Sequence, residues 1–253
     1  MAADDYDTLA SVYDWIVPAE MVTPEGSAAA FLPYLEELVP GARVLDSAAG
    51  TGPLAVGLAQ RGFDVVATDA SRGMVERTRA LAERAGVDLV ARECRWEALE
   101  SQGFAPFDAV LCVGNSLAHA PGRAARRAAL EAMAGVMKPG GVLVLTSRNF
   151  ERMRAVDPGL QVFDHVVERD GRRGVVIYSW WLADDWEDEH AFDVAVALVG
   201  DDGGVKTLGE RLSFWPFSHD MLREDLEAAG LTLETSTDEP DVDRYIVTAR
   251  RSR

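Results

Sequence analysis

Cysteine and histidine are scarce in this chain, with two and four copies among 253 residues. Cys94 and Cys112 lie in or beside apolar stretches that are typical of strands, and they lack the paired spacing of a zinc site. The acidic run at 184–190 lacks the loop spacing that a hard cation needs. We therefore expect two buried thiols in a reducing compartment and no bound metal.

The chain also lacks long apolar runs and has few basic residues. No stretch approaches the length of a membrane span, and the first residues, MAADDYD, have neither the basic segment nor the apolar core of a signal peptide. Lys and Arg total 25 against 42 Asp and Glu, which gives a formal net charge of −17. Such a surface repels phosphate backbones and anionic lipids, so we expect a cytoplasmic protein without nucleic-acid or membrane partners.

Helical and strand patterns alternate from residue 42 to residue 147. The apolar periodicity predicts strands at 42–47, 64–69, 87–92, 107–113 and 141–147, and helices at 53–61, 71–85 and 122–137. A Pro139-Gly140 turn is expected to separate the last helix from the last strand. This alternation predicts an α/β fold in which a parallel sheet is wound on both faces.

The pattern changes on either side of this region. Residues 4–37 have helical spacing, whereas 160–216 alternate like antiparallel strands, and a helix at 218–229 precedes a hairpin at 231–237 and 243–250. The hairpin would complete a mostly parallel, seven-stranded sheet. We therefore predict an N-terminal helical lid (1–40), a ligand-binding core (41–150), an antiparallel β insertion covering the active site (151–217) and a C-terminal helix and hairpin (218–253).

The segment VLDSAAGTG at 44–52 carries the clearest functional signal. An apolar strand ends there in Asp46, and Gly50 and Gly52 let the backbone turn tightly and approach a ligand. The helix that follows offers unpaired N–H groups. Asp69 comes 19 residues after Gly50, at the end of the next strand, where its carboxylate can accept both hydroxyls of a ribose. These features predict a nucleoside pocket.

Two enzyme classes use such a pocket. Gly50, Gly52 and Ala55 match the G-x-G-x-x-A pattern of nicotinamide dehydrogenases. Asp46, however, lies four residues before Gly50, and a carboxylate there suits a cationic amino acid tail better than an anionic pyrophosphate. The pattern D-x-x-x-G-x-G resembles the first motif of the class I S-adenosylmethionine-dependent methyltransferases, which implies S-adenosyl-L-methionine as the cofactor.

Three further segments make the resemblance more specific, because they resemble one group of these methyltransferases. CVGNSLAHAP at 112–121, SRNF at 147–150 and RLSFWP at 211–216 resemble motifs of the glycine N-methyltransferases and the glycine/sarcosine N-methyltransferases. The resemblance implies a small-molecule amine or amino acid as substrate. Because relatives often form oligomers, a homo-oligomer remains open.

Carried over position by position, the resemblance assigns roles within the cofactor pocket. Ala70 and Met74 would border the adenine, and Trp96 would offer a flat face to it, although Trp96 also fits an ordinary core position. The implied cofactor-binding residues are Asp46, Ala48, Gly50, Gly52, Asp69, Ala70, Met74, Arg95, Trp96 and Val113.

The resemblance also assigns the substrate site. Asn115 and Arg148, at the carboxyl ends of two strands, would clamp a substrate carboxylate, since a guanidinium forms a two-pronged pair with it. His119 could accept a proton from a hydroxyl acceptor or simply cap its loop.

Aromatic side chains are expected around the same pocket. Tyr6, Tyr13 and Trp15 would form part of a lid, and Tyr13, Trp181 and Trp215 are interpreted as substrate contacts, while the aromatics of 180–217 equally fit a local core. Arg123, Arg126 and Arg127 are interpreted as surface charge.

Three functions stay open at this point. The first is N-methylation of glycine, sarcosine or a related amino acid. The second is O- or N-methylation of a bulkier natural product on the same scaffold. The third is a protein that binds the cofactor without transferring a methyl group.

Overall fold

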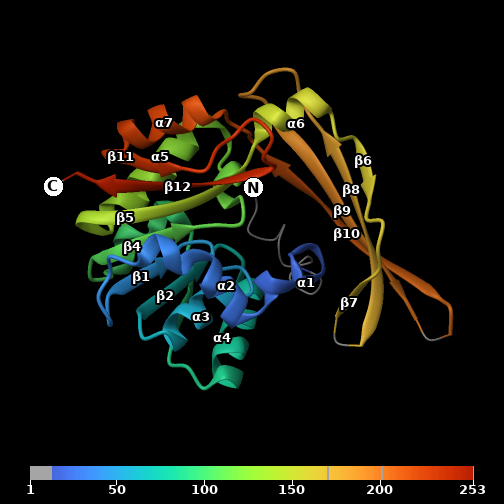
Figure 1. Ribbon diagram of the computed structural model, residues 1–253, viewed down its shortest axis with the longest axis horizontal. Helices are drawn as coiled ribbons and strands as arrows, with labels where there is room; N and C mark the ends of the chain where they lie inside the picture. Colours follow the sequence, from blue (N-terminus) through green and yellow to red (C-terminus); the bar gives the residue numbers. More distant parts are fainter. Residues whose placement is uncertain (1–12, 170, 201, 253) are drawn as a thin grey trace.

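Two β-sheets face each other in the computed structural model, which describes residues 13–169, 171–200 and 202–252 (Figure 1). The expected contributions of Tyr6 and of the rest of 1–12 lie outside the described residues. Within the described ranges, no helix combines the length and apolar character needed to cross a membrane.

The larger sheet has seven strands in the order β11-β12-β5-β4-β1-β2-β3. Strands β3, β2, β1, β4 and β5 run parallel, and β12 pairs with β5 in the antiparallel sense. The strands are β1 Arg43–Asp46, β2 Asp64–Asp69, β3 Val90–Glu93, β4 Phe107–Cys112, β5 Met137–Arg148, β11 Leu231–Ser236 and β12 Arg244–Arg251. The predicted mostly parallel, seven-stranded sheet is confirmed.

Helices cover both faces of this sheet because its strands alternate apolar residues toward each side. The helices α2 Pro24–Phe31, α3 Pro53–Gln60 and α4 Arg72–Ala85 lie on one face, and α5 Gly122–Gly135 and α7 His219–Ala228 on the other (Figure 1). Neighbouring strand residues contribute to opposite layers: Val44 packs with α2 and α3, whereas Leu45 packs with the layer of α5. Cys94 and Cys112 are both buried and unpaired, as predicted.

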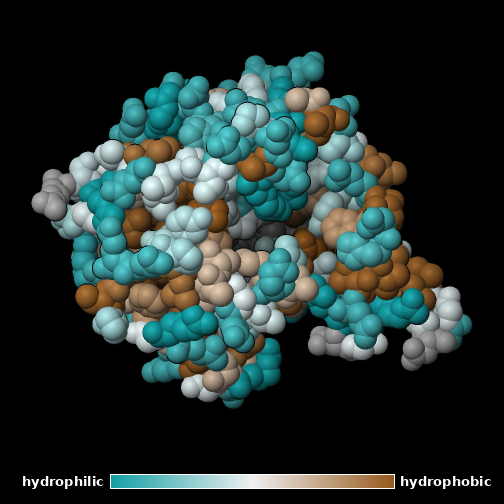
Figure 2. Space-filling view, in the orientation of Figure 1, coloured by the Kyte–Doolittle hydropathy of each residue, from teal (hydrophilic) through white to brown (hydrophobic). Residues whose placement is uncertain are grey.

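The second sheet is antiparallel and follows the short helix α6 Phe150–Val156. Its strands are β6 Leu160–Val162, β7 Val167–Arg169, β8 Arg172–Trp181, β9 His190–Val199 and β10 Val205–Phe214. Apolar residues of its inner face belong to the same buried cluster as residues of the larger sheet. Other apolar side chains gather on its exposed side, at the right of Figure 2.

Two element predictions need correction. Residues 13–35 form short pieces, α1 Tyr13–Ile16, η3 Ala19–Val22, α2 and η4 Leu32–Leu35, because Pro18, Pro24 and Pro33 interrupt a longer helix. The expected Pro139-Gly140 turn instead lies inside β5, which begins at Met137. The register of β5 on β4 shifts between Phe107 and Ala109, and such an irregularity accommodates a proline in a ladder.

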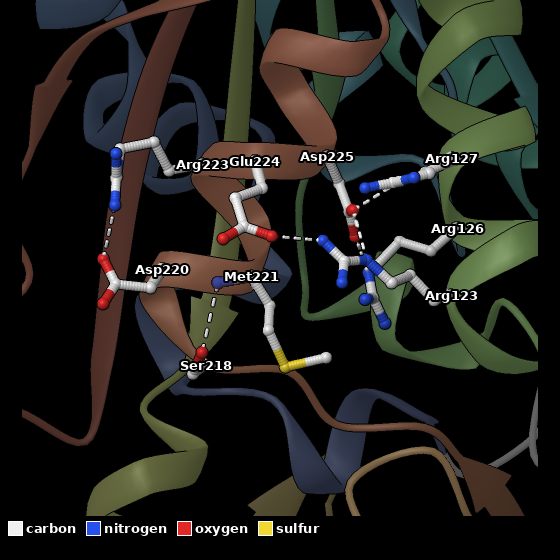
Figure 3. A network of polar contacts seen from close by, with 9 residues as sticks. All are labelled: Arg123, Arg126, Arg127, Ser218, Asp220, Met221, Arg223, Glu224 and Asp225. Carbon is white, nitrogen blue, oxygen red and sulfur yellow. Dashed lines mark hydrogen bonds and ion pairs between the residues drawn. The ribbon is translucent and has the colours of Figure 1, made fainter.

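A buried ion cluster joins α5 to α7 (Figure 3). The fully buried carboxylate of Asp225 accepts hydrogen bonds from Nε of Arg123 (2.8 Å), Arg126 (2.8 Å) and Arg127 (2.7 Å). Burial alone raises the pKa of Asp225, but the three arginines outweigh burial and lower this pKa. Arg126 is only 1% exposed, so its interpretation as surface charge was wrong. Its acidic partner, Asp225, is distant in sequence, so no local pattern indicates the pair.

We expect Asp225→Asn to destabilise the protein by about 3–5 kcal/mol, because it leaves the buried Arg126 uncompensated. Urea unfolding followed by circular dichroism measures this change. Asp220→Asn is the matched control on the same helix, since Asp220 is 80% exposed beside Arg223 and its removal should cost about 0–1 kcal/mol. Equal losses in both variants would contradict a structural role for the cluster.

Candidate active site

A cavity of about 600 Å³ lies at the carboxyl ends of the parallel strands, between the two sheets and the residue 13–31 segment. The carboxyl edge of a parallel sheet is where ligands bind in open α/β folds. Most predicted site residues line this cavity: Tyr13, Asp46, Ala48, Gly50, Asp69, Ala70, Met74, Arg95, Trp96, Val113, Asn115, His119 and Arg148. Gly52, Trp181 and Trp215 are not in its lining.

Asp46 brings a buried carboxylate to the end of β1. Neither carboxylate oxygen has a hydrogen-bond partner among the described residues. Burial, and then the charge of Asp69, raise the pKa of Asp46 to about 7. The nearby Ala48 N–H lowers this pKa in part, although its geometry is not that of a hydrogen bond. A buried acceptor without a partner is costly, and a cationic ligand group in the cavity removes that cost.

Asp69, at the end of β2, holds the glycine turn. Its Oδ2 accepts from the Gly50 N–H and its Oδ1 from the Ser71 N–H, both at 2.9 Å. The Gly50 carbonyl in turn accepts from the Thr78 hydroxyl at 2.9 Å. Each carboxylate oxygen has a second lone pair, so Asp69 can still accept hydroxyls from a ligand.

Gly52 lies outside the cavity lining and has a packing role. Its φ of +91° is left-handed, and a Cβ on Gly52 would lie 2.7 Å from Cγ2 of Thr78. Only glycine therefore lets the start of α3 pack this closely on α4. The pattern D-x-x-x-G-x-G thus combines one glycine at the cavity, Gly50, with one that brings the helices together.

Trp96 lines the cavity near the start of this turn. Its indole Nε1 donates to the Ser47 carbonyl at 2.9 Å, which fixes the plane of the ring beside the end of β1. Met74 is buried and also lines the cavity, whereas Arg95 points outward enough to pair with Glu97 at 3.7 Å. Trp96 and Met74 thus give this part of the cavity lining an apolar surface.

Asn115 and Arg148 lie together, as the sequence predicts. Asn115 has a left-handed backbone (φ 71°), and its Oδ1 accepts from the Arg148 N–H at 2.9 Å. This contact ties the end of β5 to the loop after β4 and leaves Nδ2 as the donor of the side chain. The Arg148 guanidinium lies 4.7 Å from the centre of the Trp180 ring. Burial, and then the charge of Arg244, lower the pKa of Arg148 to about 9.

His119 lies in η7, Ser116–His119, and contacts the antiparallel sheet of β6 to β10, which we call the covering sheet. Its Nδ1 lies 2.8 Å from the Ser213 carbonyl, so Nδ1 carries the hydrogen. The neighbouring Ala118 carbonyl accepts from the Trp215 N–H at 2.7 Å. The loop after β4 is therefore joined to the end of β10.

Two aromatic residues that line the cavity are each one sequence position before the residue that was predicted. Trp181 lies on the outer face of β8 and is 60% exposed, whereas Trp180 faces inward, because successive residues of a strand point to opposite faces. Similarly, Phe214 lines the cavity in place of Trp215. The cavity-facing aromatics of the covering sheet are Tyr178, Trp180, Phe192 and Phe214.

Sequence reasoning also missed Arg244, the first residue of β12, which lines the cavity. In the β12–β5 ladder it is the direct partner of Arg148. The predicted hairpin placed Arg244 on a strand, but only the pairing of that strand with β5 brings it to the site. No group of three or more metal-binding side chains comes together in the described ranges.

Comparison with known sequences places the chain among methyltransferases. A methyltransferase-domain family model matches residues 44–141. The glycine/sarcosine N-methyltransferase of Parasynechococcus marenigrum is 38% identical over 141 residues, 55% of this chain and 48% of that enzyme. The glycine N-methyltransferase of Homo sapiens is 31% identical over 208 residues, 74% of this chain and 68% of that enzyme. The chain thus spans about half of the first relative and two thirds of the second.

Solved structures agree on the fold. The CcbJ methyltransferase from Streptomyces caelestis superposes with a TM-score of 0.75 at 20% identity, covering 98% of this chain and 97% of that one. The sugar N-methyltransferase KedS8 from a Streptoalloteichus species has a TM-score of 0.68 at 24% identity, with coverage of 89% and 87%. Taken with the sequence matches, the chain belongs to the family of the glycine and glycine/sarcosine N-methyltransferases, within the class I S-adenosylmethionine-dependent methyltransferases.

Proposed function

We propose that this protein methylates the amine of a small carboxylate-bearing molecule, such as glycine, sarcosine or a related amino acid. One observation carries the proposal: a single cavity has an unpartnered carboxylate, Asp46, at one end and a largely buried guanidinium, Arg148, at another. The first suits the ammonium of an amino acid tail and the second suits a substrate carboxylate.

The cofactor half of the cavity fits S-adenosylmethionine. When bound, this cofactor supplies a methyl group already activated by a sulfonium. Asp46 would hold the ammonium of its amino acid tail, and Asp69 would accept the ribose hydroxyls while keeping its bonds to Gly50 and Ser71. Trp96 and Met74 would border the adenine.

The acceptor half of the cavity acts by positioning. Arg148 would bind the carboxylate with two parallel hydrogen bonds, and Asn115 holds the backbone of Arg148 in place. Fixed geometry of this kind can supply up to about 7–11 kcal/mol of a reaction barrier. With both ligands bound, the antiparallel sheet would help to exclude water, which would favour the neutral amine that the reaction needs. His119, with Nδ1 bonded to Ser213, serves chiefly to hold its loop.

A bulkier acceptor is the second candidate. Four aromatic side chains of the covering sheet, Tyr178, Trp180, Phe192 and Phe214, give the cavity a large apolar wall. Glycine leaves such a wall uncovered, whereas a substituted amine would bury it. The neighbour KedS8 is described as a sugar N-methyltransferase. Activity with hydrophobic amines and none with glycine or sarcosine would favour this candidate.

Asp69→Ala should weaken S-adenosylhomocysteine binding at least 100-fold, because it removes two charged hydrogen-bond acceptors worth about 1.5–3 kcal/mol each. Isothermal titration calorimetry measures the Kd. Asp64→Ala, at the exposed start of the same strand, is the control and should bind normally. Normal binding by Asp69→Ala would remove Asp69 from the cofactor site.

Binding of S-adenosylhomocysteine should depend on pH through Asp46. In the free protein its pKa is raised to about 7, so the carboxyl is largely neutral below pH 7 and must lose a proton to pair with an ammonium. We expect Kd to rise about tenfold for each pH unit below 7 and to level off above it. Calorimetry between pH 5.5 and pH 8 tests this. Asp46→Asn should bind more weakly and without the slope; the same slope in that variant would assign the proton elsewhere.

Arg148→Gln should raise the KM for the amino acid at least tenfold, because a buried guanidinium–carboxylate pair is lost. Its Kd for S-adenosylhomocysteine should change little. Arg152→Gln, four residues on and paired with Asp243 at the surface, is the control. An unchanged KM in Arg148→Gln would place the substrate carboxylate elsewhere.

A further inference from the structure

The acceptor side of the cavity contains two arginines in direct cross-strand register. Arg244 on β12 is the ladder partner of Arg148 on β5, and both side chains line the cavity. Directly opposed residues in an antiparallel pair have Cβ atoms about 4.5–5.5 Å apart, where like charges repel. The sequence therefore places two positive charges at one point of the acceptor site.

The described part of the protein does not compensate these charges with an ion pair. Asp243 exerts an electrostatic effect on both arginines, but its carboxylate pairs with Nη1 of Arg152 at 2.7 Å. Burial lowers the pKa of both guanidinium groups, and the charge of Arg244 further lowers that of Arg148. By its accessible surface Arg244 is exposed, because its side chain opens into the cavity, while the atoms packed around it still lower its pKa.

Cofactor binding does not explain the second arginine. In the order β12-β5-β4-β1, Arg244 lies three strand spacings from Asp46. At about 4.8 Å per spacing, the two backbones are roughly 14 Å apart. A cofactor tail with its ammonium on Asp46 has its carboxylate on the neighbouring carbon, so that carboxylate stays close to β1. Arg148, two spacings from β1, is already assigned to one substrate carboxylate.

We propose that Arg244 is a second anion-binding residue of the acceptor site, and that the amine acceptor carries two acidic groups. One is a carboxylate bound by Arg148, and the other is a carboxylate or a phosphate bound by Arg244. This inference rests on the proposed function. A monocarboxylate such as glycine offsets only one of the two guanidinium charges, whereas a dianion offsets both.

Pairs of acceptors that differ only in the second charge test this inference. Aspartate is compared with asparagine to probe a carboxylate, and O-phosphoserine with serine to probe a phosphate. For the wild type, we expect kcat/KM to be at least tenfold higher for the charged member of at least one pair. Arg244→Gln should reduce that ratio at least tenfold, chiefly through KM, and Arg244→Lys should restore part of it. Arg250→Gln, on the same strand but paired with Glu37 and Glu234 outside the cavity, should leave the ratio unchanged.

Three results would overturn the assignment of Arg244. These are no preference for either charged acceptor in the wild type, an unchanged ratio in Arg244→Gln, or a marked loss of S-adenosylhomocysteine affinity in that variant, which would place the cofactor carboxylate at Arg244. If the wild type methylates no amine at all, the proposed function fails by itself. The Arg244 assignment is then tested by calorimetry of aspartate and O-phosphoserine on the protein saturated with S-adenosylhomocysteine, and equal Kd values for wild type and Arg244→Gln would overturn it.

Discussion

The carboxylate of Asp69 is the contact on which the geometry of the site depends. By accepting from Gly50 on one side and Ser71 on the other, it joins the turn after β1 to the turn after β2. The Thr78 hydroxyl fixes the same turn from α4, and Gly52 allows that helix to approach. Because these contacts set the path of the backbone, Asp46 can remain buried and unpartnered without collapse of the cavity around it. A rigid turn thus keeps the Asp46 carboxylate available at the cavity.

The opposite wall comes from the antiparallel sheet, which lies outside residues 44–141 matched by the methyltransferase-domain model. The inner face of the antiparallel sheet presents aromatic side chains toward Arg148, and Trp180 lies against its guanidinium. A cation beside an aromatic face keeps part of its stabilisation when it leaves water. This side of the cavity, the proposed acceptor site, therefore combines charge from the core sheet with apolar surface from the covering sheet.

The predictable features are those encoded locally. The order of strands and helices, the buried ends of the strands and the cavity positions of Asp46 and Asp69 follow from short-range patterns, because the carboxyl ends of parallel strands meet at one edge. Trp181 was misplaced because a one-residue shift in a strand exchanges its faces. Arg244 and Arg126 escaped prediction for another reason. Their surroundings depend on pairings with Arg148 and Asp225, which lie far away in sequence.

The covering sheet is attached to the rest of the protein along two seams. Trp215 and Ser213 fasten the end of β10 to the loop that contains Ala118 and His119, through bonds of 2.7 and 2.8 Å. On the opposite side, only longer bonds of 3.3 Å are described between that sheet and the N-terminal segment, from Tyr178 to Ile16 and from Arg169 to Val17. Apolar packing holds this second seam, since Trp15 is 6% exposed and lies so close to Gly174 of β8 that an added Cβ would come within 2.9 Å of its ring. A side chain at position 174 would therefore push α1 away from the antiparallel sheet and widen the cavity along its N-terminal wall.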